Sequence, residues 1–175
     1  MEGFDNLVNL AVLNLADNML TKIENLSNCS KLDNLYLARN RIGRDGLDDL
    51  TGLLDCPSIT SLDIQGNKID DPEVLPEILM KMPELKVLYL QNNPVCKKIK
   101  NYRKTIINAI PGLRYLDDRP VFDDDRRHAE AFCAGGITAE REERELINKE
   151  KKEKHENNMA AFRAMIAKAR ADKKA

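Results

Sequence analysis

The stretch "LKVLYLQNN", residues 85 to 93, decides the fold because its pattern recurs along the chain. It has leucine at its first, fourth and sixth positions and asparagine at its ninth. Three earlier stretches share this spacing, and a later one keeps only the first two leucines: "LAVLNLADN" from Leu10, "LDNLYLARN" from Leu32, "ITSLDIQGN" from Ile59 and "LRYLDDRPV" from Leu113. Successive starts lie 22, 27, 26 and 28 residues apart. Self-similarity at such a period indicates stacked repeats.

The pattern LxxLxLxxN is that of a leucine-rich repeat, in which each repeat contributes a short strand with its leucines turned inward. Parallel stacking then buries an apolar face that no single repeat could bury alone. The sequence therefore predicts an α/β solenoid with parallel concave strands, a helical C-terminal cap and a charged C-terminal helix. We expect repeats over residues 1–112, the cap over 113–139 and the helical extension over 140–175.

The final asparagine of each repeat marks the point where the chain leaves the strand and turns. An amide side chain at this point can bond backbone groups that the turn would leave unpaired. Four equivalent copies favour a structural role over an active-site role: Asn18, Asn40, Asn67 and Asn93.

Two longer repeats and four cysteines complete the picture of the repeat region. The apolar spacing in "LDDLTGLLDC" and "PEVLPEILMKM" favours helical turns on the convex side. Cys29, Cys56 and Met82 each precede a strand by three residues, which indicates the core. The four cysteines, which include Cys96 and Cys133, form no CxxC pair and have no histidine at ligand spacing, so we expect reduced core thiols rather than a zinc site.

The repeats are expected to stop after Leu116, where the asparagine is lost. Pro120 cannot donate to a strand ladder and belongs at a sheet edge or a strand end. "FDDDRRHAEAFCAGG" then predicts a capping helix, with Asp123 to Asp125 at its start and Gly135–Gly136 at its end. We assign the cap to Asp118, Arg119, Pro120 and Phe122. A metal or catalytic role for Asp117, Asp118 and Asp123 to Asp125 is the alternative, and it requires these carboxylates to converge.

The extension from Glu140 carries eleven bases and eight acids, whereas the whole chain has 28 bases and 29 acids. Acid-first pairs at i and i+4, such as Glu140 and Arg144, support a solvated single helix. A weak apolar stripe at Met159, Phe162, Ile166 and Ala169 could dock on the domain or on a partner.

The partner surface follows from the alternation of side chains along each strand. Residues on either side of the middle leucine point away from the core onto the concave face. One column on this face should read Asn14, Tyr36, Asp63, Tyr89 and Asp117, with neighbouring columns Val12, Asn34, Ser61, Val87, Tyr115 and Ala16, Ala38, Gln65, Gln91. Two tyrosines around an aspartate are typical of an interface anchor, although aromatic residues also favour strands in general. We predict protein binding at Asn14, Tyr36, Asp63, Gln65, Tyr89, Gln91, Tyr115 and Asp117.

Other classes of function have little support in the sequence. His128 and His155 lie among charged helix residues, where we expect them to be exposed, and no nucleophile–base arrangement recurs. Acids interleaved with the lysines of the extension oppose a phosphate track, so nucleic acid is not expected. No signal peptide and no run of eighteen apolar residues occurs, so we expect no membrane partner. No cofactor is expected.

Four segments carry a resemblance to a known family: "KIENL" at 22–26, "DPEVL" at 71–75, "NYRKT" at 101–105 and especially "YLDDRPVF" at 115–122. Together with "AEAF", the glycine pair and "EREER", they resemble the axonemal dynein assembly factors of the leucine-rich-repeat-containing protein 50 family, over about Leu10 to Arg144. Other repeat proteins with this type of cap, including the spliceosomal U2 A-prime protein, share the looser motif of "NPV", "NYR" and "LDD".

The resemblance implies a non-catalytic scaffold for the cytoplasmic pre-assembly of outer and inner dynein arms. Its partners would be dynein chains, chaperones or other assembly factors, and its location the cytoplasm and the cilium or flagellum. The alternative is a stable subunit of a complex, either U2 A-prime-like or an axonemal dynein light chain. Members of the family usually have further repeats upstream and a long C-terminal extension, so we expect the chain to be a C-terminal piece of the repeat domain rather than a shortened relative.

Overall fold

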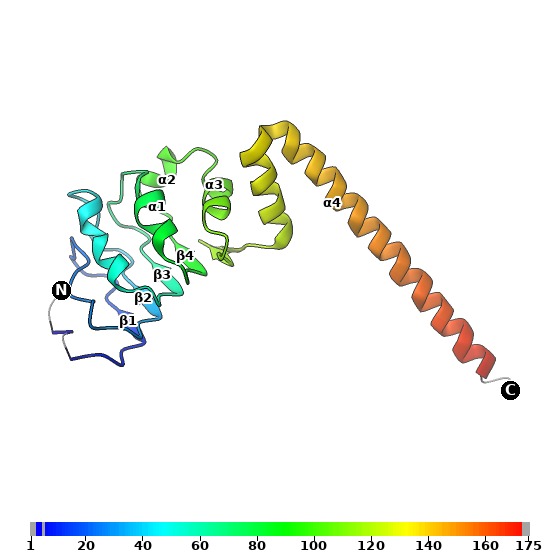
Figure 1. Ribbon diagram of the computed structural model, residues 1–175, viewed down its shortest axis with the longest axis horizontal. Helices are drawn as coiled ribbons and strands as arrows, with labels where there is room; N and C mark the ends of the chain where they lie inside the picture. The colour runs from blue at the N-terminus through cyan, green and yellow to red at the C-terminus, as the bar shows by residue number, and fades with distance from the viewer. Residues whose placement is uncertain (1–2, 5, 173–175) are drawn as a thin grey trace.

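A computed structural model describes residues 3–4 and 6–172 of the chain. In this part of the protein, six short strands form one sheet in chain order (Figure 1). The first five pair in parallel, one from each repeat, and the sixth pairs antiparallel with the fifth. The strands are β1 (Val12–Asn14), β2 (Asn34–Tyr36), β3 (Ser61–Asp63), β4 (Val87–Tyr89), β5 (Tyr115–Leu116) and β6 (Arg119–Pro120).

A ladder of leucines runs through the sheet and forms the middle of the core. Leu13, Leu35, Leu62, Leu88 and Leu116 are paired in register on neighbouring strands. The last four are at most 1% exposed, whereas Leu13 in the first strand is 9% exposed. Burial of each such side chain stabilises the fold by about 1.5–3 kcal/mol. The predicted leucine-rich-repeat solenoid is therefore confirmed.

Short helices cover the side of the core opposite the strands (Figure 1). They are η1 (Leu47–Asp49), η2 (Thr51–Asp55), α1 (Val74–Glu77), η3 (Leu79–Lys81), α2 (Val95–Lys98) and α3 (Tyr102–Ala109). The two predicted helical turns correspond to η1 with η2 and to α1 with η3, and three of these four are 3-10 helices. Close packing explains Gly52 in η2, since a Cβ there would lie 2.3 Å from the carbonyl oxygen of Ile23.

The turn asparagines join consecutive repeats through their side chains. The amide of Asn67 donates to the carbonyl oxygens of Ile64 in its own repeat, at 3.0 Å, and Leu37 in the preceding one, at 2.9 Å. Its Oδ1 accepts the N–H of Ile42 at 3.0 Å. Asn40 and Asn93 are buried and repeat this arrangement, whereas Asn18 is exposed and donates only within its own repeat. Three of the four predicted turn residues thus bond across a repeat boundary.

The last strand is followed by an edge strand and a helix. β6 contains Pro120 at the edge of the sheet, and α4 (Asp123–Asp172) begins with three aspartates. The Asp125 carboxylate accepts the N–H of Phe122 at 3.0 Å and so satisfies a backbone donor at the helix start. Arg126 donates to the carbonyl oxygens of Ile107 and Leu113, at 3.1 and 2.6 Å, which ties the helix to α3 and the last repeat.

The helix α4 is interrupted at Gly135 and Gly136. Gly136 has a φ of 69°, a backbone conformation that favours glycine, and neither residue has helical dihedral angles. The break folds α4 into a short arm (residues 123–134), which contacts the repeats, and a long arm (residues 137–172) (Figure 1). The predicted end of the capping helix at this glycine pair is therefore present, but a second helix follows at once.

The base of the long arm packs back on the short arm. Arg127 forms ion pairs of 2.6 Å with Glu143 and with Glu150, and Lys151 pairs with Asp124. Ile147 is only 3% exposed. The sequence predicts a solvated helix over the whole extension. That prediction is wrong for the base of the long arm, because the glycine break brings the two arms together.

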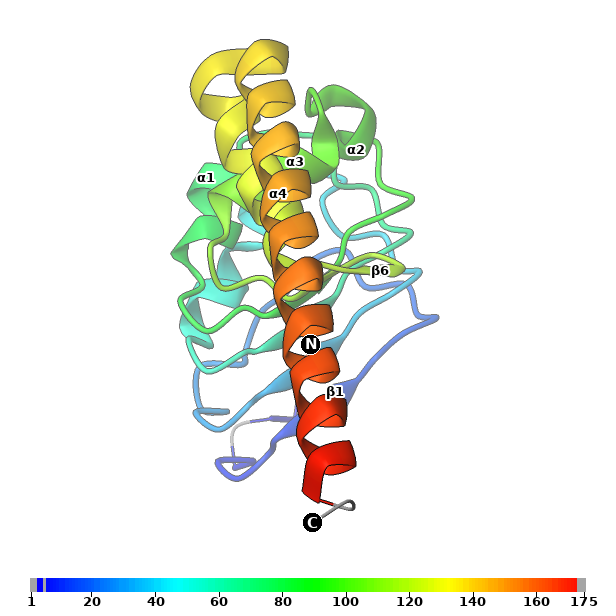
Figure 2. The same ribbon diagram turned by 90° about the vertical axis from the view of Figure 1, so that its right-hand side faces the viewer.

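Beyond Lys151 the long arm projects away from the repeats in Figure 1, and in the view of Figure 2, turned by 90°, it runs in front of them toward the viewer. The side chains of the apolar stripe remain accessible, with Met159 39% and Phe162 52% exposed. The predicted division of the chain at residues 112 and 139 remains a prediction, and the second boundary falls inside the long arm.

Two expectations about single side chains do not hold. Cys29 and Cys56 are buried as predicted, but Cys96 is half-buried and Cys133 is exposed on the short arm. Cys133 therefore is not a core thiol, because it lies on a helix face that turns away from the repeats. His128 was expected to be exposed but is half-buried, and its Nε2 lies out of contact with solvent.

Candidate functional site

The concave face, meaning the sheet face away from the short helices, presents the predicted columns of side chains. Asn14, Tyr36, Asp63 and Tyr89 are paired in register on β1 to β4. A second row runs parallel to it through Val12, Asn34, Ser61, Val87 and Tyr115. Neighbouring strands in a sheet lie about 4.8 Å apart, so the side chains of a row are close neighbours across the strands.

Three tyrosines lie on this face, one on β2 and two on the adjacent strands β4 and β5. The rings of Tyr89 and Tyr115 lie 5.8 Å apart between centroids at a tilt of 47°, and Tyr36 lies on β2, on the far side of Asp63. All three are half-buried. They offer rigid aromatic area that does not depend on the leucine core, which is what an interface anchor requires.

A chain of polar side chains runs beside the tyrosines. Gln91 donates through Nε2 to Gln65 at 3.1 Å and to the Asp118 carboxylate at 3.2 Å. Gln65 in turn donates through Nε2 to the Asp63 carboxylate at 3.2 Å. The two glutamines therefore hold Asp63 and Asp118 in fixed positions at either end of one hydrogen-bonded chain.

Asp117 lies differently from the prediction, which placed it in the tyrosine column. It follows β5 in a left-handed conformation with a φ of 54°. Its Oδ1 accepts the N–H groups of Leu90 and Gln91, at 2.9 and 3.0 Å. Asp117 thus satisfies backbone donors in the turn that follows β4. Strand alternation cannot predict this role, because Asp117 lies outside the strand.

The electrostatics of the concave face are visible at Tyr89. Burial raises the pKa of the Tyr89 hydroxyl, and the neighbouring Tyr115, Asp63, Asp118 and Tyr36 raise it further. Negative charge from two carboxylates therefore reaches the same ring. Strands β1 to β5 contain no lysine or arginine in the described chain. The nearby Arg39 is engaged by Asp17, with both hydrogen bonds at 2.5 Å.

The predicted cap residues lie on the surface at the end of the sheet. The carbonyl oxygen of Pro120 accepts a hydrogen bond of 2.7 Å from Arg103. Asp118, Arg119 and Phe122 are exposed, and the Phe122 side chain is 66% exposed. In this segment the end of the sheet is held by hydrogen bonds from Arg103 to backbone carbonyl oxygens, and the Phe122 side chain remains accessible.

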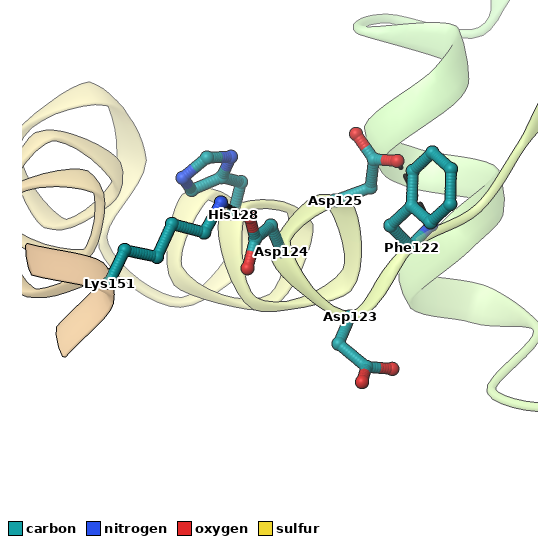
Figure 3. A pocket seen from close by; sticks show the side chains of 6 residues that line it. All are labelled: Phe122, Asp123, Asp124, Asp125, His128 and Lys151. Carbon is teal, nitrogen blue, oxygen red and sulfur yellow. Dashed lines mark hydrogen bonds and ion pairs between the residues drawn. The ribbon is translucent and has the colours of Figure 1, made fainter. Parts of the chain in front are cut away.

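The alternative carboxylate site can be judged from the pocket around Asp123 to Asp125 (Figure 3). Asp124 turns toward Lys151, Asp125 bonds the Phe122 N–H and lies 3.8 Å from Arg103, and Asp123 points the other way. Within residues 3–4 and 6–172, no three His, Cys, Asp or Glu side chains are placed to hold a metal ion. The three carboxylates therefore do not converge, and two of them are used elsewhere, Asp124 in an ion pair and Asp125 at the start of α4.

Comparison with known proteins agrees with this geometry. The model of the family described as leucine-rich repeat matches residues 5–146. The chain belongs to the leucine-rich repeat family. The match includes all five repeats, the short arm and the base of the long arm, so the members of the leucine-rich repeat family share the parts that build the concave face and its cap.

Two relatives in the leucine-rich repeat family carry informative names. The chain is 44% identical over 112 residues to "Leucine-rich repeat-containing protein ODA7" of Chlamydomonas reinhardtii, which covers 64% of this chain and 26% of that protein. It is 45% identical over 118 residues to "Dynein axonemal assembly factor 1" of Homo sapiens, covering 67% of this chain and 16% of that protein. The chain spans about a quarter or less of the length of these relatives.

A solved structure shares the fold of this leucine-rich repeat chain. A chain in the crystal structure of the Drosophila melanogaster SNF/U2A' complex superposes with a TM-score of 0.64 at 29% identity. The match covers 81% of this chain and 80% of that one.

Several residues that shape the site were not predicted from the sequence. Arg103 and Arg126 bond backbone carbonyls at the end of the solenoid, and buried Asp49 accepts the N–H groups of Gly43 and Asp45, both at 3.1 Å. The sequence does not single these residues out, because Arg126 lies in the charged run "DDDRRH" and Arg103 and Asp49 each have a charged neighbour. Among the described residues, no helix combines the length and the apolar character needed to cross a membrane.

Proposed function

We propose that this chain is part of a non-catalytic scaffold that acts in the cytoplasmic pre-assembly of axonemal dynein for cilia or flagella. The observation that carries the proposal is the identity of 44% to "Leucine-rich repeat-containing protein ODA7" and of 45% to "Dynein axonemal assembly factor 1". The partners would be dynein chains, chaperones or other assembly factors. Pre-assembly places the scaffold in the cytoplasm, before its cargo enters the cilium or flagellum.

The concave face is the proposed docking surface for these partners. Short helices cover the opposite side of the core, whereas Tyr36, Tyr89 and Tyr115 lie half-buried on the open face of the sheet. Tyrosine supplies large contact area with little loss of side-chain entropy, and it is enriched among the residues that dominate binding energy. A partner seated here would touch Asn14, Asp63, Gln65 and Gln91 as well.

Replacing Tyr36 and Tyr89 together by alanine tests the docking surface. We expect binding to dynein chains and chaperones in ciliated-cell extract to weaken by at least about 2 kcal/mol, since both rings are removed from the centre of the face. The urea midpoint should change little, because the rings lie outside the leucine core.

The matched control replaces Phe122 and Phe162, two exposed aromatic residues away from the concave face. This pair should leave capture unchanged. Equal capture by the tyrosine double variant and the parent protein would place the partner on the convex side or on α4 instead.

A stable subunit of a particle is the second candidate function. It is favoured by the structural likeness to a chain of the SNF/U2A' complex. Gel filtration of a cell extract separates the two. An assembly factor should elute in cytosolic fractions, in less than equimolar amounts relative to dynein, whereas a subunit should co-elute with its particle at fixed stoichiometry.

A further inference from the structure

Two carboxylates on the concave face, Asp63 and Asp118, make no direct ion pair with a described residue, although Arg39, which Asp17 holds, is close enough to Asp63 to interact electrostatically. Asp63 accepts the N–H and the Nε2 group of Gln65, and Asp118 accepts one bond from Gln91. Neither forms an ion pair with a described residue, although the chain contains 28 lysines and arginines. Each carboxylate can accept about four hydrogen bonds, so both keep free capacity toward solvent.

The tyrosines stand beside these carboxylates. Asp63 lies in register between Tyr36 on β2 and Tyr89 on β4, and Tyr115 lies 5.8 Å from Tyr89. Asp118 is linked to Asp63 through the two glutamines described above. We call the group formed by Tyr36, Asp63, Tyr89, Tyr115 and Asp118 the acidic tyrosine cluster.

A partner that covers the acidic tyrosine cluster must compensate two charges. Removing a carboxylate from water without a counter-charge is strongly unfavourable, so a neutral partner would bind poorly here. A lysine or arginine side chain would restore the balance, and it would also be attracted to the electron-rich faces of the tyrosine rings. Arginine fits best, because its planar group can stack on a ring while it bonds a carboxylate.

We infer that the acidic tyrosine cluster receives an arginine, or less favourably a lysine, from a partner protein that docks on the concave face. This inference rests on the proposed docking role of the face and adds the chemistry that the partner must present. The two carboxylates beside the tyrosine rings select for a basic residue in the partner.

A short peptide probe tests the inference on the full chain. Acetyl-Gly-Arg-Gly amide is titrated at low ionic strength while the ring signals of Tyr36, Tyr89 and Tyr115 are followed by NMR. The matched probe replaces arginine by citrulline, which keeps the shape and removes the charge. The arginine probe should shift the ring signals in a saturable way, and the citrulline probe should bind at least about tenfold more weakly.

Two protein variants complete the test. The double change Asp63→Asn and Asp118→Asn should raise the dissociation constant of the arginine probe at least about tenfold. The control pair Asp45→Asn and Asp55→Asn removes the same charge from exposed positions off the concave face and should leave it unchanged. Unchanged far-UV circular dichroism and urea midpoints verify that each variant is folded. Equal binding of both probes, or full arginine binding by the Asp63 and Asp118 variant, would overturn the inference.

Partner capture by the tyrosine variant and by the aspartate variant distinguishes failure of this inference from failure of the proposed function. Loss of dynein-chain capture in the Tyr36 and Tyr89 variant, with normal capture in the Asp63 and Asp118 variant, overturns the basic anchor and leaves the docking surface standing. Normal capture in both variants overturns both.

Discussion

At the scale of single residues, the asparagine at the end of each repeat makes different hydrogen bonds depending on whether another repeat packs beside it. Asn67 bonds two carbonyl oxygens and one N–H across a repeat boundary and is 2% exposed. Asn18 occupies the equivalent position in the first repeat but is exposed and bonds only the carbonyl oxygens of Leu15 and Ala16. The pattern LxxLxLxxN predicts all four positions, yet only the packed neighbour decides how much each contributes.

Replacing Asn67 by alanine should therefore destabilise the protein by at least about 2 kcal/mol, because buried backbone groups lose their partners. Replacing Asn18 by alanine should cost less than about 0.5 kcal/mol, as for an ordinary surface change. Urea unfolding of the two variants measures the difference. Similar midpoints for both would mean that the cross-repeat bonds do not carry the stability assigned to them.

The pKa of Tyr89 offers a second test at this scale. Burial raises this pKa first, and the negative charges of Asp63 and Asp118 add to the effect because they disfavour a phenolate nearby. Changing both aspartates to asparagine should lower the pKa of Tyr89, although it should stay above the usual tyrosine value while the ring remains buried. An NMR titration of the ring carbon bonded to oxygen measures it. A pKa that does not move would show that the carboxylates are electrostatically remote from the ring.

At the scale of elements, periodicity predicts the strands well and the end of the chain only in part. Leucines three and two positions apart fix the parallel strands, because each buries its side chain against the next repeat. The helix α3 (Tyr102–Ala109) was not predicted, although Tyr102, Ile106 and Ile107 have the spacing of one helix face. Lys104 pairs with Glu140 at 2.6 Å, a contact that exists only because the long arm folds back.

The fold-back of α4 could not be predicted from the sequence, because the contacts that hold it join residues far apart in the chain. A glycine pair is a common end of a helix, and nothing local indicates that the following residues return to the preceding helix. The residues that hold the two arms together, such as Arg127 with Glu143 and Glu150, lie 16 and 23 positions apart. Acid–base pairs four positions apart were the more obvious signal, and Glu150 pairs with Arg127 instead.

Ile147 provides the test of this hairpin. It is 3% exposed, so Ile147→Ala should lower the local stability of the base of the long arm by about 2 kcal/mol. Phe162→Ala, at an exposed position farther along the same helix, should have no such effect. Hydrogen exchange of the amides at residues 137–151 is the appropriate measurement, because the hairpin can open without unfolding the repeats. Unchanged exchange in the Ile147 variant would contradict the packing described here.

At the scale of the whole molecule, the solenoid and the far half of the long arm should behave as independent parts. The core continues from Leu13 to Ala129 on the short arm, whereas no side chain described between Lys151 and Ala169 belongs to it. The concave face was predictable as a set of columns, because strand alternation is regular. The carboxylate chain through Gln65 and Gln91 was not, because it depends on side-chain orientation across three repeats.

Two truncations test this division. Ending the chain after Lys152 should leave the urea midpoint and slope unchanged, since exposed side chains contribute little to the core. Ending it after Leu116 should cost several kcal/mol, because it removes β6, the short arm and the Arg126 bonds, and exposes the last repeat. A large loss in the first truncation would show that the free arm packs on the repeats in solution.

The glycine break allows a small change in angle at the base of the long arm to displace its far end by many ångströms. The long arm is a helix of about 54 Å at about 1.5 Å per residue, and it is anchored only near its base. A tilt of about 10° at Gly135–Gly136 would sweep its tip through about 9 Å by simple geometry. The ion pairs that hold the base are partly exposed to solvent, and salt screens such pairs. Ionic strength therefore acts on the ion pairs beside the glycine break, and a small change in angle there moves the tip of the long arm by a much larger distance.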